Sequence, residues 1–139
     1  MSKGALVLSS STMGVALEHA IVLAVDDEEE MREMIAMILE RHVREVVVAG
    51  SVEEAMALLD SVHPTLIVSD ICMPEADGYD LIRRVRATDE NRQTPAVALS
   101  AYAQDACRDA ALAAGFDMFV RKPLDLKCFV PLLKALLRD

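Results

Sequence analysis

The sequence predicts a doubly wound α/β fold built on one parallel sheet of five strands. Short apolar runs alternate along the chain with amphipathic stretches whose apolar residues recur at helical spacing. Strands that alternate with helices form a parallel sheet covered on both faces. Right-handed crossovers then restrict the topology to a doubly wound arrangement.

Each expected strand is an apolar run that ends at a polar residue or a turn former. Pro95 fits the fourth strand because proline is tolerated at a strand's first residue. The expected strands cover Ala20–Val25, Arg44–Ala49, Leu66–Asp70, Ala96–Ser100 and Phe116–Val120.

The expected helices follow these strands, and most carry recognisable end signals. Ser51 and Glu54 form a capping-box pattern, and Gly115 suits a helix C-cap. Pro131 falls past the first turn of the last helix, so we expect that helix to start late or to have a distorted first turn. The helices are expected at residues 28–41, 51–62, 77–85, 104–114 and 125–137.

Length, charge and cysteine content limit the classes of function. A chain of 139 residues fits one domain, and its formal charge of -9 argues against direct contact with nucleic acid or an anionic membrane. The three cysteines form no C-x-x-C pair, so neither a disulfide framework nor a zinc site is predicted. A reducing cytoplasm is the simplest compartment.

The first 19 residues differ from the rest of the chain. Ala5–Leu8 loosely resembles the apolar core of a signal peptide, but serines dilute it and Glu18-His19 interrupts the later apolar run. We expect residues 1–19 to be a poorly ordered leader, linker or expression remnant. The domain is expected to cover residues 20–139.

Polar side chains gather where the strands end. Asp26 and Asp27 follow the first strand, Asp70 ends the third, Ser100 ends the fourth, and Lys122 follows the fifth. Converging carboxylates favour a bound hard cation such as Mg²⁺, which takes carboxylate and phosphate oxygens. Lysine and hydroxyl groups can stabilise a transferring phosphoryl group. The sequence therefore predicts an acidic phosphoryl site, although each residue alone has an ordinary structural explanation.

In this combination the residues resemble the receiver domain of two-component response regulators, over about residues 20–138. The matching motifs, in order, are Asp26-Asp27, Asp70, Met73-Pro74, Asp77-Gly78, Ser100-Ala101, Phe119 and Lys122-Pro123. The resemblance implies a flavodoxin-like strand order of 2-1-3-4-5. The pattern around Ala98–Pro123 is somewhat closer to the receivers of hybrid histidine kinases.

The resemblance also implies a mechanism. Asp70 takes a phosphoryl group from a histidine kinase or a histidine phosphotransfer protein, with help from Lys122 and Ser100. Mg²⁺ is held by Asp26, Asp27, Asp70 and the backbone carbonyl of Cys72. Ser100 and Phe119 form the conformational switch. The chain then catalyses only its own phosphorylation and dephosphorylation, and we expect a monomer or weak dimer.

Two further expectations concern single positions. Tyr102 is bulky and lies two residues past Ser100, so we expect it to shield the acyl phosphate from water. The methionines of the first helix, Met31, Met34 and Met37, are core residues on the commoner interpretation and part of a partner-binding face on the other.

Two other functions remain open at this stage. A haloacid dehalogenase-like phosphatase would also use Asp70 as nucleophile with Mg²⁺, but Cys72 stands where its second acid is needed and no cap domain fits. A flavodoxin-like FMN-binding protein would need a Ser/Thr/Gly-rich phosphate loop after the first strand, where the sequence has acidic residues.

Overall fold

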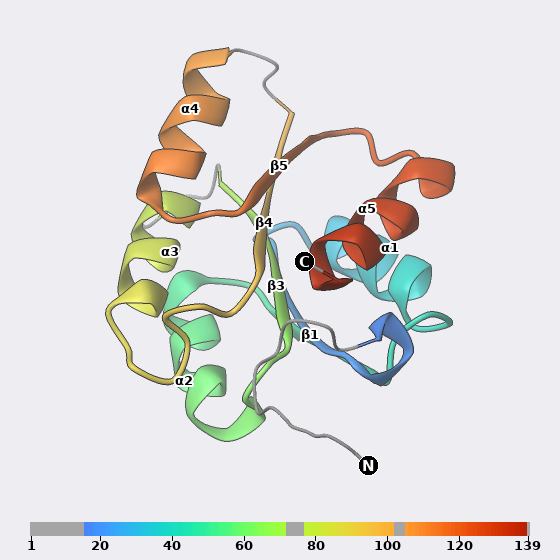
Figure 1. The fold of residues 1–139 in the computed structure, drawn as a ribbon, viewed down its shortest axis with the longest axis horizontal. Coiled ribbons are helices and arrows are strands. Elements are labelled where there is room, and N and C mark those ends of the chain that lie inside the picture. The colour runs from blue at the N-terminus through green and yellow to red at the C-terminus, as the bar shows by residue number, and fades with distance from the viewer. Residues whose placement is uncertain (1–15, 72–76, 102–104, 139) are drawn as a thin grey trace.

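The computed structural model describes residues 16–71, 77–101 and 105–138. Its five strands are all parallel and lie in the order β2-β1-β3-β4-β5 (Figure 1). This order confirms the doubly wound, flavodoxin-like fold. The strands are β1 (Ile21–Val25), β2 (Glu45–Ala49), β3 (Leu66–Asp70), β4 (Ala96–Ser100) and β5 (Met118–Arg121).

Helices cover both faces of the sheet and bury a separate apolar cluster on each. Helices α1 and α5 lie on one face, and α2, α3 and α4 lie on the other (Figure 1). None of the helices in the described ranges has the length and apolar character needed to cross a membrane. The helices are α1 (Glu29–Leu39), α2 (Val52–Val62), α3 (Gly78–Arg86), α4 (Asp105–Ala114) and α5 (Leu126–Arg138), preceded by a 3₁₀ turn at Leu17–His19.

The helix end signals expected from the sequence are present in the structure as capping hydrogen bonds and as a glycine conformation. Ser51 Oγ accepts a hydrogen bond from the Glu54 N–H at 3.1 Å, and Asp77 Oδ1 accepts one from the Asp80 N–H at 3.0 Å. Gly115 ends α4 with a φ of 132°, a conformation that strongly favours glycine. These local contacts fix where α2 and α3 begin and where α4 ends.

Three details differ from the expectations. β5 begins at Met118 rather than Phe116, because the Phe116 N–H donates to Ala111 O at the end of α4. α5 begins at Leu126, so of the two alternatives expected for this helix the late start was wrong, and Pro131 lies inside the helix on its exposed side. Leu17, within the expected leader, is buried in the core on the α1 and α5 face. Residues 1–15 lie outside the described ranges, so their assignment stays a prediction.

A partly buried arginine links several elements at the amino-terminal edge of the sheet. Arg86, at the end of α3, donates to the backbone carbonyls of Gly115 at 2.9 Å, Asn91 at 3.0 Å and Thr94 at 2.6 Å. It also pairs with Asp117 Oδ2 at 3.0 Å. One side chain thereby joins α3, the loop before β4 and the start of β5.

Candidate functional site

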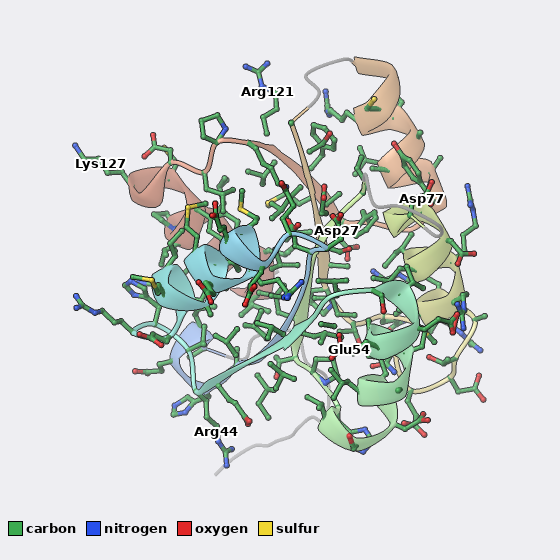
Figure 2. All side chains as sticks on the ribbon, turned by 180° about the vertical axis from the view of Figure 1, so that it is seen from behind. Asp27, Arg44, Glu54, Asp77, Arg121 and Lys127 are labelled. Carbon is green, nitrogen blue, oxygen red and sulfur yellow. The ribbon has the colours of Figure 1, made fainter. Side chains whose placement is uncertain are left out.

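The carboxyl-terminal edge of the sheet gathers the polar residues that the sequence singled out. Asp70 and Ser100 are the last residues of β3 and β4, and Asp26 and Lys122 directly follow β1 and β5. Asp26 and Asp70 are only 0% and 4% exposed. Asp27 is exposed and lies where β1 ends (Figure 2). This edge therefore combines buried carboxylates with one that solvent reaches.

Three carboxylates and one ammonium group meet at this edge. Oxygens of Asp26, Asp27 and Asp70 all lie within 4.8 Å of one another. Lys122 Nζ lies 3.1 Å from Asp26 Oδ2 and 3.6 Å from Asp70 Oδ1. In the described part of the chain, the three carboxylates outnumber the ammonium group of Lys122 that pairs with them. Such an excess favours a divalent cation.

The ammonium of Lys122 responds to these neighbours. Burial alone would lower its pKa, but the attraction of Asp70 and Asp26, with a smaller contribution from Glu28, outweighs burial and raises the pKa. Lys122 is therefore charged throughout the physiological pH range. It provides a fixed positive charge beside Asp70.

The carboxylates offer the oxygen donors that Mg²⁺ prefers. Asp26 already uses both oxygens, since Oδ1 accepts from the Glu28 N–H at 2.9 Å and Oδ2 faces Lys122. Exposed Asp27 can direct an oxygen to an incoming ion, and Asp70 lies within the same group. The residues thus fit a magnesium ion, which Asp26, Asp27 and Asp70 would hold together with several waters.

The expected switch residues lie on adjacent strands. Phe119 is half-buried and pairs in register with Ala98, two residues before Ser100. Because side chains alternate along a strand, Ser100 and Phe119 belong to the same face of the sheet. The Lys122 N–H donates to Ser100 O at 2.8 Å, which links the ends of β4 and β5. Cys72, Met73-Pro74 and Tyr102 lie outside the described residues, so their roles stay predictions.

Two contacts at this edge escaped the sequence-based interpretation. Arg32 Nη1 donates to the backbone oxygen of Asp26 at 2.9 Å, which no local pattern around Arg32 indicates. Gly78 packs so closely on the end of β3 that a Cβ there would lie 2.6 Å from Asp70 O. The family motif Asp77-Gly78 includes Gly78, but the spacing of the motif does not explain why glycine is needed at this position.

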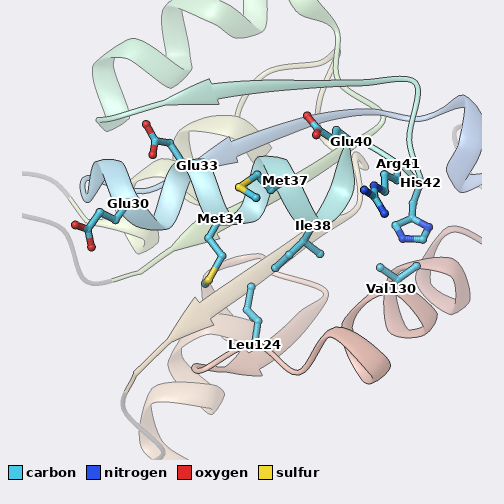
Figure 3. Close-up of a pocket in the computed structure, with 10 residues that line it drawn as sticks. All are labelled: Glu30, Glu33, Met34, Met37, Ile38, Glu40, Arg41, His42, Leu124 and Val130. Atoms are coloured by element: carbon cyan, nitrogen blue, oxygen red, sulfur yellow. The ribbon is translucent and has the colours of Figure 1, made fainter.

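A groove lies between α1 and the chain from Leu124 into the first turns of α5 (Figure 3). Its volume is about 680 Å³. Met37 is 68% exposed and Met34 is 37% exposed, and both line the groove. The three methionines of α1 therefore have different environments. Met34 and Met37 lie at the surface, whereas Met31 packs against the core.

Comparison with known proteins agrees with the fold. The model of the response regulator receiver domain matches residues 22–134. A 14.6 kDa protein of Leptolyngbya boryana is 43% identical over 75% of this chain and 79% of its own length. The transcriptional regulatory protein TrcR of Mycobacterium tuberculosis is 38% identical over 84% of this chain but only 45% of its own length. The chain thus spans about half the length of the transcriptional regulatory proteins it matches.

Two solved structures of receiver proteins also have a similar fold. The chemotaxis protein CheY4 of Vibrio cholerae superposes with a TM-score of 0.81 at 28% identity, covering 86% of this chain and 99% of CheY4. The receiver domain of a histidine kinase from Syntrophus aciditrophicus has a TM-score of 0.77 at 30% identity, covering 85% and 89% of the two chains.

Fold and site define the class: a parallel α/β domain with an acidic, lysine-containing site at the carboxyl edge of its sheet. This chain belongs to the response regulator receiver domain family and is a receiver domain of two-component signalling. The comparisons do not support the phosphatase alternative.

Proposed function

We propose that Asp70 is the phosphoacceptor of this receiver domain. The observation that carries the proposal is the position of Lys122, whose Nζ lies 3.6 Å from Asp70 Oδ1 inside the three-carboxylate group. Asp70 ends a strand that is buried along its whole length, so its carboxylate is held at a fixed place. A fixed nucleophile beside a fixed positive charge suits phosphoryl transfer.

In this reaction a carboxylate oxygen of Asp70 attacks the phosphorus of a phosphohistidine. The new O–P bond forms as the N–P bond breaks, and the imidazole of the donor leaves. Lys122 stabilises the charge that develops on the phosphoryl oxygens, and Ser100 supplies a hydroxyl donor. Bound Mg²⁺, held by Asp27, Asp70 and Asp26, would neutralise further negative charge there.

Ser100 and Phe119 then report the phosphorylated state. The hydroxyl of Ser100 moves to a phosphoryl oxygen, and the ring of Phe119 turns into the space that is vacated. The shared face of the two residues and their adjacent strands support this coupling. Phe119 has no hydroxyl, so any partner contact made through it is apolar.

The phosphodonor is a histidine kinase or a histidine phosphotransfer protein that docks on the groove along α1. Glu30 lies in the first turn of α1, two residues from Glu28, whose N–H binds Asp26. A partner seated there brings its histidine close to Asp70. The acidic side chains of Glu30, Glu33 and Glu40 favour basic groups around the apolar contact.

The acceptor is tested with a small phosphodonor. Wild-type protein incubated with acetyl phosphate and Mg²⁺ should gain the mass of one phosphoryl group, and Asp70→Asn should gain none while remaining folded. The matched control is Asp60→Asn, an exposed change on α2. Labelling that persists on Asp70→Asn, or a lack of labelling on wild-type protein, would contradict the proposal.

A further inference from the structure

The contact between Arg32 and Asp26 has no part in the phosphoryl chemistry described above. Arg32 lies on α1 and sends Nη1 to the backbone oxygen of Asp26 at 2.9 Å. That oxygen belongs to the peptide unit that joins Asp26 to Asp27. Because the peptide unit is planar, fixing its oxygen also fixes the direction in which the chain enters Asp27.

The guanidinium of Arg32 depends on a glycine of a different element. Gly50 follows β2, and a Cβ at this position would lie 2.8 Å from Nη1 and 3.4 Å from Cζ of Arg32. Glu54 of α2 holds Gly50 by accepting its N–H at 2.7 Å. The neighbouring Ala49 accepts the N–H of Asp26 at 3.1 Å. Gly50 therefore leaves room for the guanidinium directly beside the Asp26–Asp27 turn.

We propose that Arg32, seated against Gly50, is a positioning residue for the cation site: it orients the Asp26–Asp27 peptide so that Asp27 faces the ion. The inference rests on the proposed function because it assumes that Mg²⁺ binds at the three carboxylates. Asp27 is the exposed carboxylate of this group, so it is the one that packing restrains least. Contacts around metal ligands commonly affect affinity about 10- to 100-fold.

The charge of Arg32 makes the proposal testable. A positive side chain near a metal site repels Mg²⁺, so by Coulomb's law alone its removal should tighten binding. If Arg32 positions the turn, its removal should instead weaken Mg²⁺ binding, because loss of the hydrogen bond frees the Asp26–Asp27 turn. Gly50→Ala separates the two effects further, since it moves the guanidinium without removing any charge.

The fold should tolerate both changes. The Cβ of Gly50→Ala would meet the far end of a flexible side chain, which can swing away, rather than backbone. Thermal unfolding followed by circular dichroism checks this for each variant. Arg84→Met is the matched control, because Arg84 is also a paired arginine but binds Glu53 on the surface between α2 and α3.

The experiment measures the Mg²⁺ dissociation constant of the full chain by isothermal titration calorimetry, without any phosphodonor. We expect Arg32→Met and Gly50→Ala each to weaken Mg²⁺ binding roughly tenfold, and Arg84→Met to leave it unchanged. In metal-free protein the amide resonances of Asp27 and Glu28 should shift in the first two variants only. The double variant should bind Mg²⁺ no more weakly than Arg32→Met alone, because both changes remove the same contact between Arg32 and Asp26.

Other outcomes overturn the inference. Unchanged or tighter binding in Arg32→Met means that the arginine acts only through its charge or not at all. Additive effects in the double variant mean that Gly50 does not act through Arg32. If wild-type protein binds no Mg²⁺, the cation site of the proposed function fails as well, whereas normal wild-type binding with unaffected variants refutes only the role of Arg32.

Discussion

Two partly buried cations at opposite edges of the sheet have pKa values shifted in opposite directions, because their partners differ. Arg86, at the amino edge, is surrounded mainly by neutral backbone carbonyls, with Asp117 as its carboxylate. Burial lowers the pKa of Arg86 more than Asp117 raises it. Lys122, at the carboxyl edge, faces carboxylates, and their attraction raises its pKa despite burial.

The difference separates a structural cation from a functional one. Arg86 donates its hydrogen bonds to backbone carbonyls of the loop before β4 and of Gly115, so its contacts hold structural elements together. Lys122 faces a group of three carboxylates, which, among the described residues, still offers negative charge that an ion can neutralise. We therefore expect changes at Arg86 to affect stability and changes at Lys122 to affect phosphorylation.

The largest effect is expected for Lys122→Met. Loss of the ammonium group should slow phosphorylation by acetyl phosphate roughly 10²- to 10³-fold, as for loss of one preorganised donor in other active sites. Mg²⁺ binding should tighten, because a competing positive charge is removed. Intact-mass kinetics and calorimetry measure the two quantities, and weaker Mg²⁺ binding would show that Lys122 organises the carboxylates instead.

Arg86→Met should lower stability and leave the phosphorylation rate nearly unchanged, the reverse of the effect expected for Lys122→Met. The change leaves three partly buried backbone carbonyls without their donor and Asp117 without its cation, so the free energy of unfolding should fall by about 2–4 kcal/mol. Urea denaturation measures this. The phosphorylation rate of the folded protein should stay within about twofold of wild type. A large loss of rate with normal stability would remove the distinction between the two cations.

Gly78→Ala tests how closely the functional edge is packed. Its Cβ would lie 2.6 Å from Asp70 O and 2.7 Å from Ile71 Cα, which are backbone atoms of the acceptor strand and the residue after it. We expect a loss of about 1–3 kcal/mol in unfolding free energy, together with slower phosphorylation, because relief of the clash must move Asp70. Gly50→Ala, which meets only a side chain, is the control; equal stability losses would contradict this difference.

The smallest effect concerns pH. The folded-state pKa of Lys122 is raised above its ordinary value of 10.5, so its stabilising contribution is complete below that pH and is lost as the pH rises through the folded-state pKa. The difference in melting temperature between wild type and Lys122→Met should be constant from about pH 7 to 9 and shrink above about pH 10.5. If this difference in melting temperature changed near neutral pH, a titrating group other than Lys122 would be responsible.

The sequence alone determined the fold class and much of the site. Apolar runs that end in Asp26, Asp70 and Ser100 are local features, and parallel strands necessarily bring their carboxyl ends to one edge. Helix caps such as Ser51 and Asp77 also involve neighbouring residues, so spacing suffices to find them. The family motifs then gave the strand order before any coordinates.

Tertiary structure decided the contacts that join distant segments. The distances from Lys122 to Asp26 and Asp70, the carbonyls around Arg86, and the place of Arg32 against Gly50 all depend on how separate elements pack. Such contacts have no period or fixed spacing in the chain, because packing geometry rather than local propensity selects them. The place of Asp70 at the end of a strand could therefore be predicted from the sequence, whereas the contact of Arg32 with the backbone of Asp26 could be found only in the folded molecule.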